Sequence, residues 1–137
     1  MKKVLLTLLF GTYIFAASGM QWLTLKEAQE VSKLTYRPYF VMVVKDGCPY
    51  CEQEKRAMES DKKFQKLIND NMIPVLINQD HETVPDIFFT SATPTIFIYD
   101  NKQDRLVVKP AYGAIPTDKL KPWIQNVLFM WSRQFKW

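Results

Sequence analysis

The tetrapeptide Cys48-Pro49-Tyr50-Cys51 holds the only two cysteines of this 137-residue chain and lies where an apolar run meets a helix-forming run. Residues 39–44 are continuously apolar and rich in Val, which is typical of a strand buried on both faces. Residues 52–58 favour a helix. A cysteine at the first turn of a helix lies beside unpaired N–H groups and the positive end of the helix dipole, which favours the thiolate. The sequence therefore predicts a strand-to-helix junction that carries a nucleophilic thiol.

The N-terminal segment has the order of a secretory signal peptide. Lys2 and Lys3 precede a mostly apolar stretch, residues 4–17, and small residues follow at 16–19. This stretch is short for a membrane helix of about 20 residues, although an uncleaved anchor or a buried helix is the alternative. We therefore expect residues 1–18 to be a signal peptide and residues 19–137 to form one domain. Export to the periplasm would let a disulfide persist.

Charge and composition exclude several classes of function. The net charge is +4, and removal of Lys2 and Lys3 leaves 16 basic and 14 acidic residues. This excess of positive charge is too small to indicate a nucleic-acid-binding protein. Cys48, Cys51 and His81 are too few for a four-ligand zinc site, and we interpret His81 as a solvent-exposed side chain. The glycines form no nucleotide-binding loop. We expect no metal and no cofactor other than a redox-active disulfide.

Periodicity gives the remaining elements. A capping box at Thr24-Leu-Lys-Glu27 predicts a helix that runs to about Thr35. Two further helices are predicted, one from Ser60-Asp61 to about residue 71 and a short one at 83–89. The C-terminal segment predicts an amphipathic helix with Thr117 as its cap. Further strands are expected at 72–78, 93–99 and 105–109, the last two forming a hairpin. This order predicts an α/β domain, a small mixed sheet of about four strands with helices on both faces.

From about Tyr39 to Leu128 the chain resembles a thioredoxin-fold thiol-disulfide oxidoreductase. The resemblance rests on the CPYC motif between strand and helix, on Thr93-Pro94 opening a later strand, and on the hairpin, Gly113 and terminal helix. It implies that Cys48 is the exposed nucleophile and that Cys51 resolves the mixed disulfide. It also implies that Pro49 and Tyr50 support the site, and that a cis Thr93–Pro94 bond faces the cysteines and aligns the substrate.

Two other segments indicate which thioredoxin-fold relatives this chain resembles most. Thr83-Val84-Pro85 resembles the turn that glutaredoxins use, but only a short apolar stretch follows it, so we expect Pro94 to be the active-site proline and Pro85 to start a helix. If Pro85 held that place, a glutathione-dependent glutaredoxin-like enzyme would be the better interpretation. Residues 60–67 resemble a segment of exported thioredoxin-like reductases, which favours a periplasmic electron carrier that reduces disulfides.

The chain also departs from the thioredoxin pattern. Thioredoxins bury an Asp six residues before the first cysteine, where Met42 stands here, and its Lys partner falls near Val75 or Leu76. We therefore expect a drier core, with water or a group at the rim accepting the proton of Cys51. Candidates for that group are Glu52, Lys45 and Asp46.

Other functions of the same residues stay open. A disulfide oxidase or isomerase has the same motif, a non-catalytic binding module would have an inert disulfide, and a structural disulfide this short would contribute only about 2 kcal/mol. The expected partners are proteins with cysteines or disulfides and a membrane or soluble thiol electron donor, and the expected state is a monomer.

In the aromatic tail we expect Phe129 and Trp131 to complete the core, while Phe135 and Trp137 either pack against the domain or form a patch that binds a partner.

Overall fold

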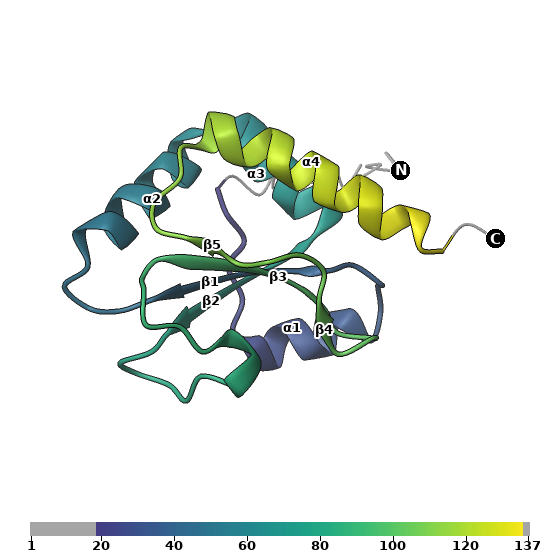
Figure 1. Cartoon of the computed structure of the whole chain (residues 1–137), viewed down its shortest axis with the longest axis horizontal. Coiled ribbons are helices and arrows are strands. Elements are labelled where there is room, and N and C mark those ends of the chain that lie inside the picture. The colour runs from purple at the N-terminus through teal and green to yellow at the C-terminus, as the bar shows by residue number, and fades with distance from the viewer. Residues whose placement is uncertain (1–18, 136–137) are drawn as a thin grey trace, which may run out of the picture.

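The computed structural model describes residues 19–135, which form one sheet covered by helices on both faces (Figure 1). The predicted signal peptide, Lys136 and Trp137 lie outside the described residues. The helices are α1 (Leu25–Ser32), α2 (Pro49–Ser60), α3 (Lys62–Asn71) and α4 (Thr117–Arg133), with a 3-10 turn η1 (Asp86–Phe88). The strands are β1 (Tyr39–Val44), β2 (Ile73–Asn78), β3 (Thr95–Asp100), β4 (Arg105–Leu106) and β5 (Ala111–Tyr112).

Strand pairing places the cysteines at one end of the sheet, just beyond the last residue of β1. The order is β2-β1-β3-β4, with β5 also paired to β3, and β1 runs parallel to β2 but antiparallel to β3. Val43 at the end of β1 is the partner of Thr95 at the start of β3. Because of this pairing, the chain leaving β1 towards Cys48 meets the chain entering β3 after Thr93. The predicted α/β class and mixed sheet are confirmed.

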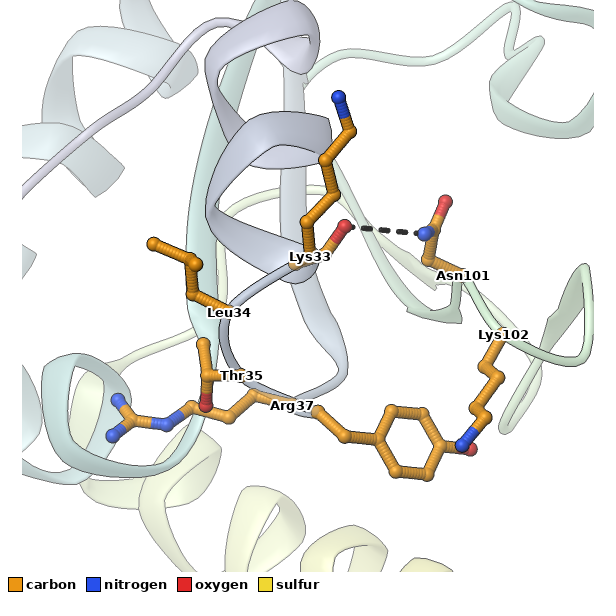
Figure 2. A pocket seen from close by; sticks show the side chains of 8 residues that line it. Lys33, Leu34, Thr35, Arg37, Asn101 and Lys102 are labelled. Atoms are coloured by element: carbon orange, nitrogen blue, oxygen red, sulfur yellow. Dashed lines mark hydrogen bonds between the residues drawn. The ribbon is translucent and has the colours of Figure 1, made fainter.

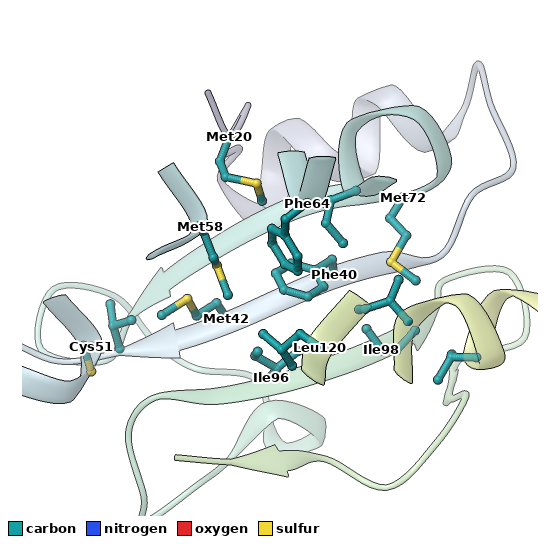
Figure 3. Packing of buried hydrophobic residues seen from close by; sticks show 14 of the residues in the cluster. Met20, Phe40, Met42, Cys51, Met58, Phe64, Met72, Ile96, Ile98 and Leu120 are labelled. Carbon is teal, nitrogen blue, oxygen red and sulfur yellow. The ribbon is translucent and has the colours of Figure 1, made fainter. Parts of the chain in front are cut away.

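All six residues of β1 are buried, because its two faces contact different helices. Phe40, Met42 and Val44 face a core shared with α2, α3 and α4, and Figure 3 shows Phe40 and Met42 among side chains from those helices. Tyr39, Val41 and Val43 face a second core that includes Ala28 of α1 and Phe88 of η1. A continuous apolar strand is thus covered on both sides, as its sequence predicts.

Several element boundaries differ from the prediction. The sheet has five strands rather than about four, because Ala111–Tyr112 pairs with the start of β3. The first helix ends at Ser32, and residues 83–89 form only the three-residue turn η1. Pro116, not Thr117, is the N-cap of α4, since the Thr117 hydroxyl donates to Asp61 Oδ2 at 2.8 Å. The capping box of Thr24 and Glu27 is present as predicted.

The C-terminal helix is fixed at its far end by a buried carboxylate. Asp100 is fully buried and accepts hydrogen bonds from Trp131 Nε1 at 2.9 Å and from the Tyr36 hydroxyl at 2.8 Å. Trp131 is half-buried and in edge contact with Tyr36 and Phe135, so it packs against the domain but outside the two core clusters that it was expected to complete. The expectation for Phe129 was wrong, because it is 60 % exposed on the outer side of α4.

Within residues 19–135, no helix has the length and apolar character needed to cross a membrane.

Candidate active site

Cys48 and Cys51 form a disulfide at the start of α2, with their Cα atoms 5.3 Å apart. Cys48 is the N-cap, its backbone extended, and Pro49 occupies the first turn, where its missing N–H has no intrahelical partner to lose. The Cys51 N–H donates to Cys48 Sγ at 3.1 Å. The sulfur thus holds the place of a capping oxygen and lies at the positive end of the helix dipole.

The loop before β3 lies against the same sulfur. The Thr93–Pro94 peptide bond is cis, and the Thr93 hydroxyl donates to Cys48 Sγ at 3.5 Å. The Thr93 carbonyl oxygen lies 3.6 Å from that sulfur. On the other side, the Gly113 N–H donates to the Pro94 carbonyl at 2.8 Å, which joins this loop to the segment after β5. Gly113 has a φ of 82°, a left-handed conformation that suits glycine.

Exposure differs among the residues predicted for the site. Cys51 is fully buried and Cys48 is 6 % exposed, so Cys48 is the more accessible cysteine but is much less exposed than expected, with the Thr93 loop beside it. Tyr50, on the first turn of α2, is 64 % exposed. Of the six predicted residues, Cys48, Cys51 and Thr93 are brought together through hydrogen bonds and the disulfide, with Pro94 adjacent.

The three candidate rim groups Lys45, Asp46 and Glu52 are all exposed. Glu52 lies 3.4 Å from Lys55, and Asp46 lies 2.7 Å from His81 Nε2. His81 is exposed as expected, but it has a partner that the sequence did not reveal. Pro85 directly precedes η1, so it starts a helical turn as predicted.

Glu54 is a residue of this region that the sequence analysis missed. Its side chain is only 2 % exposed, and burial raises its pKa to about 7, against the opposing effect of the Ile115 N–H. The sequence predicted a drier core with water or a rim group as the proton acceptor of Cys51, and it did not indicate this buried carboxyl group on α2. The signal was its spacing, since Cys51, Glu54 and Met58 are three and four residues apart and share one helix face.

A shallow cavity of about 380 Å³ lies at the opposite end of the sheet (Figure 2). It is lined by the last residue of α1, by the loop that follows (residues 33–37) and by the turn after β3, where Asn101 donates to the Ser32 hydroxyl at 3.2 Å. This cavity contains no residue of the cysteine site. Among residues 19–135, no three His, Cys, Asp or Glu side chains gather as a metal ion would need.

Comparison with solved structures shows the same fold in several proteins. A thioredoxin from Thermus thermophilus is 20 % identical, with a TM-score of 0.66 over 80 % of this chain and 87 % of that chain. DsbH oxidoreductase is 16 % identical, with a TM-score of 0.63 over 85 % and 90 % of the two chains. The periplasmic thioredoxin SoxS from Paracoccus pantotrophus, in reduced form, is 14 % identical, with a TM-score of 0.51 over 69 % and 98 %.

A search of curated proteins finds no match to this sequence. The model of the thioredoxin-like domain family, however, matches residues 25–128, which include both cysteines, the Thr93–Pro94 loop and most of α4. This match agrees with the resemblance drawn from the motif and with the fold. The chain therefore belongs to the thioredoxin-like domain family.

Proposed function

We propose that this protein is an exported thiol-disulfide oxidoreductase that reduces disulfides in proteins of the cell envelope. The observation that carries the proposal is the Cys48–Cys51 disulfide at a helix N-terminus, with the Cys51 N–H and the Thr93 hydroxyl both directed at Cys48 Sγ. These donors favour a Cys48 thiolate when the pair is reduced. Export to the periplasm rests on the signal pattern of residues 1–18.

In this proposal Cys48 is the nucleophile. Its thiolate attacks one sulfur of a substrate disulfide, a mixed disulfide forms, and the first substrate thiolate leaves and takes a proton from water. Cys51 then loses its S–H proton and attacks Cys48 Sγ, and the second substrate thiolate leaves and takes up a proton. The protein is left with the Cys48–Cys51 disulfide, so two electrons have passed to the substrate, and a thiol electron donor must return them.

The remaining site residues position the substrate and the helix. Pro49 fixes the first turn of α2, exposed Tyr50 flanks the site, and Thr93 and Pro94 provide the backbone against which an extended substrate aligns. The reductive direction is supported by the resemblance of residues 60–67 to exported reductases. The protein acts as a monomer in this proposal.

Selective alkylation tests the nucleophile. In the reduced protein at neutral pH, we expect iodoacetamide to modify Cys48 at least about tenfold faster than Cys51, because the donors found among residues 19–135 are directed at the Cys48 sulfur and favour its thiolate. Mass spectrometry of quenched samples measures both rates, and the variant Cys51→Ser should trap substrates on Cys48. Two equally slow thiols would instead indicate a binding module with an inert disulfide.

A further inference from the structure

A buried carboxyl group, that of Glu54, lies on the same face of α2 as Cys51. The buried residues of α2 are Cys51, Glu54 and Met58, and Figure 3 shows Cys51 and Met58 with Met42 at one end of the core cluster. On a helix, side chains three residues apart have Cβ atoms about 5–6 Å apart. This spacing would let the Glu54 carboxyl approach the Cys51 sulfur, directly or through one water molecule.

Glu54 is not fully satisfied by its surroundings. Its Oε2 accepts the Ile115 N–H at 2.9 Å, while its Oε1 is buried and has no hydrogen-bond partner among residues 19–135. A buried ionised carboxylate normally has partners for both oxygens, because an unpaired one is costly. Glu54 Oε1 thus lacks the hydrogen bond that would stabilise an ionised carboxylate, so the buried group can bind a proton.

The charged groups around Glu54 have other partners or face solvent. On α2, Lys55 lies 3.4 Å from the exposed Glu52. On the segment packed against it, Ile115 presents a backbone N–H, and Lys121 of α4 pairs with Asp61 at 2.6 Å. The two causes of the raised Glu54 pKa of about 7 are burial, which raises it, and the Ile115 N–H, which lowers it. No cation among these groups holds Glu54 in its ionised form.

We propose that Glu54 is the proton acceptor for Cys51 in the resolving step, an inference that rests on the proposed function. The Cys51 S–H proton moves to the Glu54 carboxylate, and the thiolate attacks Cys48 Sγ. The Cys48–Cys51 bond forms, the bond from Cys48 to the substrate sulfur breaks, and the substrate leaves as a thiolate. The proton then passes from Glu54 to that thiolate or to water. An acid that titrates near neutral pH suits this exchange.

The resolving step can be followed with an aromatic disulfide reagent, dithionitrobenzoate. Reduced Cys48 releases one coloured thiolate when it attacks the reagent, and Cys51 releases a second when it resolves the mixed disulfide. Stopped-flow absorbance measures both phases across a pH series. In the wild-type protein we expect the second-phase rate to rise as pH increases through about 7, where Glu54 ionises, and then to level off.

The variant Glu54→Gln keeps an oxygen that can accept the Ile115 N–H but removes the base. We expect its second phase to be at least about tenfold slower at pH 8, with no step near neutral pH, and its first phase to be unchanged. Glu59→Gln, an exposed residue of the same helix, should behave as wild type. If Glu54→Gln does not fold, as judged by circular dichroism, Glu54→Met fills the same volume without a base and should show the same loss.

The outcomes separate this inference from the proposed function. A second phase that keeps the wild-type rate or the wild-type pH step in the folded Glu54 variant would overturn the role of Glu54 alone. A slower second phase with the pH step retained would likewise assign Glu54 to the structure of the loop. A wild-type protein without a rapid first phase would instead contradict the proposed function.

Discussion

At the scale of single residues, Glu54 links the chemistry of the site to the stability of the domain. Folding removes its carboxyl from water, and burial raises its pKa from 4.5 to about 7. Between these two pH values the folded protein binds more protons at Glu54 than the unfolded chain does. Its contribution to the free energy of unfolding is therefore greatest below pH 4.5 and is lost as pH rises through about 7.

This direction of the pH dependence of stability gives a prediction for the oxidised protein. Between pH 5 and pH 8, the contribution of Glu54 to the free energy of unfolding falls by up to about 3 kcal/mol. In Glu54→Gln we expect the dependence of the unfolding free energy on pH to shrink by that amount, as measured by urea denaturation at both pH values. Glu59→Gln should keep the wild-type dependence. An unchanged dependence in Glu54→Gln would show that the carboxyl is ionised and well solvated in the folded state.

The residues of the site differ in how far the sequence predicts them. Cys48, Cys51, Thr93 and Pro94 belong to two short motifs, so the sequence indicates all four. Glu54 stands in a run of alternating charges, residues 52–66, that reads as a solvent-facing helix. Only its spacing from Cys51 and Met58 separates it from its exposed neighbours in the sequence, and the hydrogen bond that its Oε2 accepts comes from Ile115, which is 61 residues away.

At the scale of secondary-structure elements, Asp61 joins three helices. It ends α2 and caps α3, where its Oδ1 accepts the Phe64 N–H at 2.9 Å. Its Oδ2 accepts from Lys121 at 2.6 Å and from Thr117 at 2.8 Å. The Lys121 hydrogen bond, followed by the Phe64 N–H, lowers the pKa of Asp61 to about 2, so this residue is ionised at neutral pH.

We expect Asp61→Ala to lower the unfolding free energy by about 1–2 kcal/mol at neutral pH, because α3 loses its cap. The pKa of Asp61 is depressed on folding, so this difference should persist above pH 3.8 and vanish as pH falls towards about 2. Chemical denaturation of both proteins across this range measures it. Asp70→Ala, which breaks an exposed pair with Lys66, should cost less than about 0.5 kcal/mol. Equal costs for both variants would rule out the capping role.

The elements themselves were largely predictable, whereas several of their ends were not. Apolar runs and helical spacing give β1, β2, β3 and the four α-helices. The cap of α4 was assigned wrongly, because the Thr117 hydroxyl donates to Asp61 on another helix, a contact that local spacing does not reveal. Strand β5 has only two residues, Ala111–Tyr112, and is defined by its pairing with β3. Such long-range contacts decide the boundaries.

At the scale of the whole molecule, the sheet order assembles the site. The central strand β1 lies between β2 and β3, which brings the start of α2 to the Thr93–Pro94 loop, and that loop contacts Gly113 after β5. Asp100 holds α4 from the other end of β3 through Trp131. The sequence alone predicted a mixed sheet with helices on both faces, but it did not predict the order of the strands, since apolar runs do not specify their neighbours.

The reduction potential of the Cys48–Cys51 couple tests the central claim most directly. Residues 19–137 would be equilibrated in graded dithiol buffers, free thiols trapped by alkylation, and the reduced fraction measured by mass spectrometry. We expect a reversible two-electron couple near the thioredoxin value of about −270 mV. A value of about −120 to −180 mV would contradict the reductive direction and favour an oxidase or isomerase, and a disulfide that resists reduction throughout would contradict a redox function altogether.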